Sequence, residues 1–156
     1  LGIFVLLGTL AGGLALRTAL PNREATSGEL GLLALIAAIG VALVVRDSLR
    51  ITVSLHKFVE AGIRCALCTG LLAALPWCAL FWAVRRGATL MPELAGGLIG
   101  IAAFSFGFAA SRLGCPIDNA AHILLWHVLP LGLGTGLSVV AGIAWLQRGT
   151  DRIRHA

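Results

Sequence analysis

The sequence predicts an all-α, polytopic transmembrane helix bundle, and two observations support this prediction. First, 58% of the 156 residues are hydrophobic, 12% are charged and the mean hydropathy is +0.95, a composition far outside that of soluble globular domains. Second, the apolar residues gather in five runs bounded by charge, and about 20 apolar residues cross the hydrocarbon core as a helix. No strand-like alternation interrupts the runs, so we expect a single transmembrane helical domain over residues 1–156.

Turn-forming residues divide the chain into these runs. Pro21 follows the first run, Gly87 lies between the third and fourth, and Pro116 lies between the fourth and fifth. We expect the first run to be truncated at its beginning, and the second is short for a membrane span. The five predicted spans are residues 1–16, 29–45, 61–84, 92–111 and 119–147.

The stretch RDSLRITVSLHKFVEAGIR joins the second and third spans. It is charged and amphipathic, which is typical of a segment that lies along the membrane surface. We therefore predict an interfacial segment over residues 46–60.

Basic residues near the ends of the spans predict the orientation. Seven arginines fall on one side of the membrane and five basic residues on the other, and three of the five lie in the interfacial segment. The positive-inside rule then places the C-terminus in the cytoplasm. Five spans would leave Leu1 outside, so a cytoplasmic N-terminus requires a sixth span upstream. The seven are Arg17, Arg23, Arg85, Arg86, Arg148, Arg152 and Arg154.

Glycines four residues apart predict close contacts between helices. Gly96 with Gly100, and Gly132 with Gly136, form GxxxG patterns, and such small residues let helix backbones approach where lipid provides no hydrophobic driving force. We favour packing within this bundle over dimerisation through these glycines.

The four cysteines differ in predicted depth. Cys65 begins the third span, and Cys78 lies about 20 Å deeper at 1.5 Å per residue. Cys115 follows the fourth span, on the same predicted outer side as Cys65. We expect Cys115 to meet Cys65, or Cys68 one turn deeper, but not Cys78. Two roles stay open for Cys65 and Cys115: a thiol pair that senses oxidants or soft metals, and inert helix packing.

Polar residues cluster in the stretch LGCPIDNAAHILLWHVLP at the entrance of the fifth span. Asp118 and His122, together with the Cys65 and Cys115 pair, are the candidate metal ligands; the alternative is a helix cap and an interfacial hydrogen-bonding residue. His127 lies about 140° around an α-helix from His122, so we do not expect both to hold one metal. We predict a structural role for His127 near the kink at Pro130.

Other functional classes are disfavoured. No charged residue falls in the middle of a predicted span, as most ion pathways require. No nucleophile with a base, phosphate loop or dinucleotide motif is present, so we predict no enzymatic activity and no cofactor. The poor ligand geometry along one helix disfavours haem or quinone at the histidines. The net charge of +5 is dispersed, which favours the lipid bilayer and not nucleic acid as the partner.

Most of the chain resembles the NrsF-type membrane anti-sigma factors of bacteria, strongly over residues 62–136 and by hydropathy alone over the first two spans. The residues that support this resemblance are Cys65, Pro76, the Arg85, Arg86, Gly87 and Ala88 turn with Pro92, the Gly96, Gly97 and Gly100 stripe, Cys115, Pro116 and Asp118, and Trp126 with His127.

The resemblance implies six spans in the bacterial inner membrane. It also implies a cytoplasmic N-terminal segment, absent from this sequence, that binds a sigma factor of the extracytoplasmic-function (ECF) class. Cys65 and Cys115 would serve the release of that factor in response to an oxidant or a metal. The alternative function is an accessory or stabilising subunit of a larger membrane complex, with no sensing role.

Overall fold

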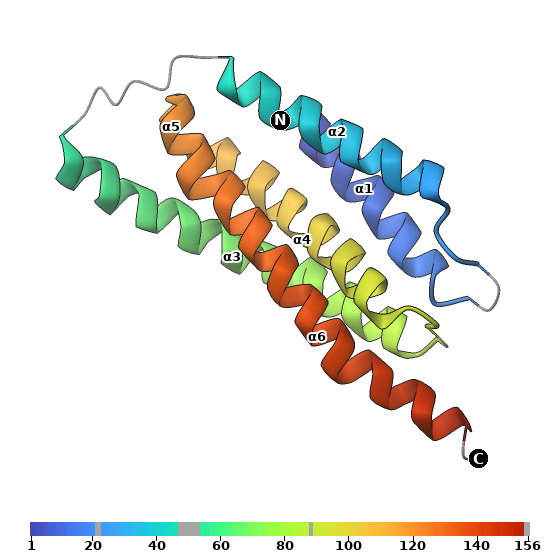
Figure 1. The fold of residues 1–156 in the computed structure, drawn as a ribbon. Helices are drawn as coiled ribbons and strands as arrows, with labels where there is room; N and C mark the ends of the chain where they lie inside the picture. Colours follow the sequence, from blue (N-terminus) through green and yellow to red (C-terminus); the bar gives the residue numbers. More distant parts are fainter. Residues whose placement is uncertain (21–22, 47–53, 88, 155–156) are drawn as a thin grey trace.

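The chain folds into a bundle of helices, and no strand occurs among the residues that the computed structural model describes, which are 1–20, 23–46, 54–87 and 89–154. The helix that begins at Ala120 continues through a π-helical turn, η1, without a break (Figure 1). The elements are α1 (Gly2–Arg17), α2 (Ser27–Val45), α3 (Leu55–Arg85), α4 (Pro92–Gly114), α5 (Ala120–Ile123), η1 (Leu124–Val128) and α6 (Leu129–Arg154).

Four of the described helices are long and apolar enough to cross a membrane. They are α2, α3, α4 and the helix Ala120–Leu146 formed by α5, η1 and most of α6. Helix α1 is also apolar but has 16 residues, fewer than a full span needs. The predicted all-α polytopic bundle is confirmed, and four of the five predicted spans reach membrane-crossing length.

Helix α4 lies at the centre of the bundle. It packs between α1, α3 and α6, whereas α2 lies on the outside against α1 (Figure 1). Twelve of the 23 residues of α4 are buried, most of them Gly, Ala or Ser. By contrast, α2 buries only Leu33 and Gly40 and exposes Leu32, Leu35 and Leu43. Small side chains thus let three helices enclose α4, while larger apolar side chains cover the outer surface that faces lipid.

Glycines permit a close contact between α4 and α6. A Cβ atom at Gly96 would overlap the backbone oxygen of Ser138 and lie 3.0 Å from Cα of Gly142. A Cβ at Gly100 would lie 2.7 Å from Cα of Thr135. Gly96 and Gly100 therefore stand where only a hydrogen atom fits.

The predicted packing role of Gly132 and Gly136 is wrong for this bundle. Nothing lies within 4 Å of a Cβ atom at either position. Gly142 and Gly134 make the close contacts of α6, with Gly96 and with the ring of Phe104. The GxxxG spacing is present, but it lies on the face of α6 that is turned away from α4.

Ser138 connects three helices through its hydroxyl group. It donates a hydrogen bond to the backbone oxygen of Gly96 on α4, at 2.7 Å, and accepts one from Trp77 Nε1 on α3, at 2.9 Å. Because lipid offers no competing hydrogen-bond partner, these bonds help to fix α6 against α3 and α4.

Helix α3 begins at Leu55, six residues before the predicted span. The predicted interfacial segment therefore divides: residues 47–53 lie outside the described residues, and residues 55–60 form the first turns of α3. Phe58 gives a physical reason for this extension, because its buried ring packs against the rings of His122 and Trp126, with centroids 5.8 and 6.1 Å away. At 31 residues, α3 is about 46 Å long.

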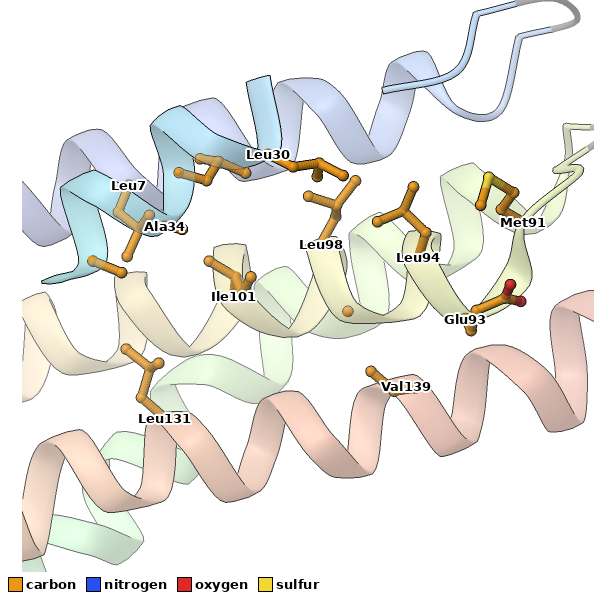
Figure 2. A pocket seen from close by; sticks show the side chains of 13 residues that line it. Leu7, Leu30, Ala34, Met91, Glu93, Leu94, Leu98, Ile101, Leu131 and Val139 are labelled. Carbon is orange, nitrogen blue, oxygen red and sulfur yellow. The ribbon is translucent and has the colours of Figure 1, made fainter. Parts of the chain in front are cut away.

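An open apolar cavity of about 560 Å³ lies between α2 and α6, with α4 as its floor. Figure 2 shows leucine, isoleucine and valine side chains around it, with Glu93 near one end. Glu93 is the only charged residue in the described lining. The described lining of this cavity has no cluster of polar groups that could bind or act on a ligand together. We therefore look for the candidate functional site elsewhere in the bundle.

Candidate functional site

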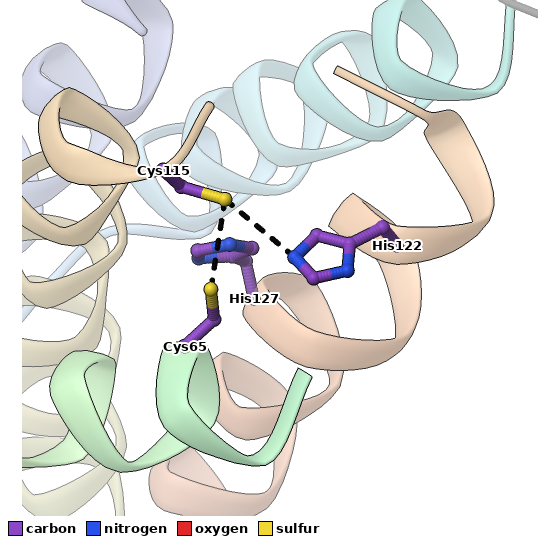
Figure 3. Close-up of side chains that lie close together, drawn as sticks. All are labelled: Cys65, Cys115, His122 and His127. Atoms are coloured by element: carbon purple, nitrogen blue, oxygen red, sulfur yellow. Dashed lines mark hydrogen bonds between the residues drawn. The ribbon is translucent and has the colours of Figure 1, made fainter. Parts of the chain in front are cut away.

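Two cysteines and two histidines from different elements meet at one end of the bundle. They are Cys65 of α3, Cys115 after α4, His122 of α5 and His127 of η1, and Figure 3 shows their side chains turned toward one another. The two Sγ atoms lie 3.5 Å apart, and Cys115 Sγ lies 3.5 Å from Nε2 of His122. One ligand atom from each residue lies within 4.8 Å of the other three. We call these four residues the thiol–imidazole centre.

Close packing of α3 on α4 positions Cys65. A Cβ atom at Gly107 of α4 would overlap the backbone oxygen of Thr69, one turn after Cys65. Thr69 donates a hydrogen bond to the backbone oxygen of Cys65, at 2.9 Å, and its hydroxyl lies 2.8 Å from that of Ser111 on α4. These contacts fix the position of Cys65 along α3, next to the C-terminal end of α4.

Arg112 positions Cys115. Helix α4 ends at Gly114, and Cys115 has extended backbone dihedral angles. The guanidinium group of Arg112 donates hydrogen bonds to the backbone oxygens of Ile117, at 2.8 Å, and of Cys115, at 3.4 Å, and it pairs with Asp118. One arginine side chain thus folds the loop back over the end of α4 and turns the Cys115 thiol toward Cys65.

The structure does not place Asp118 among the candidate metal ligands. Its side chain is 85% exposed and pairs with Arg112, so it points away from the thiol–imidazole centre. Asn119 is the helix cap, because its side-chain oxygen accepts hydrogen bonds from the backbone N–H groups of Ala121 and His122, at 2.9 and 3.3 Å. The carboxylate expected at the metal site is a loop-stabilising group.

The predicted separation of His122 and His127 is wrong, and the π-helix explains why. In a π-helix the backbone bonds run from residue i+5 to residue i, and here the N–H of Leu129 donates to the oxygen of Leu124. This wider turn brings two residues five apart toward the same face, and the two imidazole centroids lie 5.6 Å apart.

Pro130 gives the physical reason for the π-helix. It has no N–H to donate to the oxygen of Trp126, and its ring would clash with that oxygen in an α-helix. The proline was the sequence signal that could have revealed the pairing of the two histidines, because prolines are a main cause of disrupted helical hydrogen bonding.

The two imidazole groups lie deep inside the bundle. Both histidine residues are 0% exposed. The ring of Phe58 packs against His122 in an edge-to-face arrangement, and that of Phe108 packs in the same way against His127, each with a centroid distance of 5.8 Å. Nδ1 of His127 lies 3.0 Å from the hydroxyl of Ser111. Nε2 of His127 and Nδ1 of His122 have no hydrogen-bond partner among the described residues.

The remaining cysteines take no part in the centre. All four cysteines are free, and Cys68 and Cys78 are exposed on the outer surface of the bundle. The expected meeting of Cys115 with Cys65, and not with Cys78, agrees with this geometry. Chemically, two adjacent thiols can form a disulfide, and two thiolates with two imidazoles can bind a soft metal ion.

A comparison with protein families gives a match over most of the chain. The family model NrsF, described as negative regulator of sigma F, matches residues 1–147 of the chain. No curated protein and no solved structure matches it. Since the family match covers nearly the whole chain, the protein belongs to the NrsF family of negative regulators of sigma F.

Proposed function

We propose that this negative regulator is an inner-membrane anti-sigma factor that holds an ECF sigma factor inactive and releases it when an oxidant or a soft metal acts on Cys65 and Cys115. The family assignment supports a sigma factor as the regulated partner, and four membrane-length helices support attachment to a bilayer. The observation on which the sensing role depends is the 3.5 Å distance between the two Sγ atoms, which belong to residues 50 positions apart.

Oxidation by a peroxide is one route to release. One thiol is oxidised to a sulfenic acid as the peroxide is reduced to water, and the second thiol then displaces a further water to form the S–S bond. A disulfide requires about 2.05 Å between the sulfur atoms, so Cys65 and Cys115 would close by about 1.5 Å. A soft metal acts on the same pair by binding both thiolates.

Helix α4 is suited to transmit this change across the bundle. Cys115 directly follows α4, and α4 packs against α1, α3 and α6 along its length. A pull of α4 toward α3 would therefore shift the opposite end of the bundle, where Arg17 and Arg85 end their helices. We assign this basic end and the C-terminus to the cytoplasm. The sigma factor would bind there, through a cytoplasmic N-terminal segment.

Serine substitutions test the sensing role. We expect Cys65→Ser and Cys115→Ser, each alone, to reduce induction of a sigma-dependent reporter by peroxide or Cd²⁺ to the uninduced level. Cys68→Ser and Cys78→Ser are matched controls on α3, because these thiols face away from the centre, and they should respond like the wild type. Immunoblots of membranes would establish equal protein levels. Undiminished induction in both Cys65→Ser and Cys115→Ser would refute the sensing role.

A further inference from the structure

We propose that Cys65, Cys115, His122 and His127 together form a tetrahedral site for a divalent d¹⁰ cation, Zn²⁺ or Cd²⁺. This inference rests on the proposed sensing role of Cys65 and Cys115 and deepens it. It names the ion class and adds two ligands, of which His127 lies outside the expected metal set.

Two distances between ligand atoms of the centre match those of a tetrahedral site. Zinc binds cysteine sulfur at about 2.3 Å and histidine nitrogen at about 2.0–2.1 Å, so tetrahedral ligand atoms lie roughly 3.3–3.8 Å from one another. The Sγ–Sγ distance and the distance from Cys115 Sγ to His122 Nε2 are both 3.5 Å. All four atoms lie within 4.8 Å of one another, so no distance needs to shorten by more than about 1.5 Å to reach the tetrahedral range.

Hydrogen bonds around His127 leave the correct ring nitrogen free. The hydroxyl of Ser111 lies 3.1 Å from the backbone oxygen of Phe108 and 3.0 Å from Nδ1 of His127, so it can donate to the oxygen and accept the N–H of Nδ1. Nε2 then carries the lone pair, and this buried atom has no hydrogen-bond partner among the described residues. Histidines that bind metals are typically held in this way by a second hydrogen bond on the other nitrogen.

Charge balance selects the ion. The histidines are fully buried, and an uncompensated charge is costly in such surroundings. A divalent ion that displaces the protons of Cys65 and Cys115 gives a neutral complex with two neutral imidazoles, and two protons are released. Two sulfur and two nitrogen ligands in a tetrahedron favour Zn²⁺ or Cd²⁺ over Mg²⁺ or Ca²⁺, which prefer oxygen ligands.

The site would connect three separate parts of the chain. Its ligands come from α3, from the loop after α4 and from the helix that contains the π turn. A bound ion would therefore clamp the end of α4 to α3 and η1.

Cobalt binding to the purified, reduced full chain in detergent tests the proposal without the sigma factor. Co²⁺ should bind with one ion per chain, give the visible absorption of a tetrahedral complex with a thiolate charge-transfer band, and be displaced by Zn²⁺ but not by Mg²⁺. We expect His127→Gln and His122→Gln each to weaken Co²⁺ binding at least tenfold. His56→Gln, which replaces an exposed histidine at the start of α3, should leave binding unchanged.

A second measurement needs no variant and so does not depend on folding of the mutants. Zn²⁺ should protect Cys65 and Cys115 of the wild-type chain from alkylation while Cys68 and Cys78 react. The proposed site would be overturned if Zn²⁺ did not change the alkylation of Cys65 and Cys115. It would also be overturned if the cobalt spectrum of His127→Gln were the same as that of the wild type. Because neither assay uses transcription, metal binding with an unresponsive reporter would contradict the sensing role alone.

Discussion

Gly96→Val is expected to separate α4 from α6 and to lower the stability of the folded bundle by about 3 kcal/mol or more, the upper end of the usual cost of overpacking. The first added carbon alone would overlap the backbone oxygen of Ser138. A backbone atom cannot rotate away as a side chain can, so the two helices must move apart. That movement would also break the hydrogen bond from Ser138 to the backbone oxygen of Gly96.

Gly136→Val is the matched control, because it places the same side chain on a helix surface with nothing within 4 Å of its Cβ atom. Its effect should stay within about 0.5 kcal/mol, as is usual for surface substitutions away from special features. Reversible unfolding in mixed micelles of dodecyl sulfate and a mild detergent, followed by tryptophan fluorescence, measures both variants. Equal stabilities would mean that α4 and α6 do not pack through Gly96.

This pair of glycines also marks the limit of what the sequence predicts about the fold. Hydropathy and charge suffice to find the helices, since crossing a bilayer requires a long apolar run. They do not reveal which face of a helix meets its neighbour, because both faces of a membrane helix are apolar. Gly96 and Gly136 both occur in GxxxG patterns, but only Gly96 lies in a contact.

The candidate site, like the fold, could be predicted only in part from the sequence. Helix rise and loop position place Cys65 and Cys115 at one end of the bundle, and their sulfur atoms lie together there. His127 was missed because the angle from His122 was derived from an ideal α-helix, whereas the chain forms a π turn between them. Asp118 was wrongly predicted to be a metal ligand, because no sequence pattern indicates that it pairs with Arg112.

Pro130→Ala is expected to weaken Co²⁺ binding by the thiol–imidazole centre at least tenfold while leaving the bundle folded. Alanine restores an N–H that can donate to the oxygen of Trp126, so residues 124–128 can return to α-helical hydrogen bonding. His127 would then lie about 140° around the helix from His122. The imidazole of His127 would then move out of the thiol–imidazole centre and lose its hydrogen bond with the hydroxyl of Ser111.

Pro76→Ala supplies the control, since Pro76 also lies within a long helix, in α3, eleven residues beyond Cys65. It should bind Co²⁺ like the wild type. The two proline variants therefore separate a general change in helix flexibility from a local change in the direction of one imidazole. Wild-type affinity and spectrum in Pro130→Ala would mean that the metal ligands do not depend on the π turn. In that case the turn would owe its presence to packing around Trp126, whose ring lies where a side chain at Gly62 would otherwise stand.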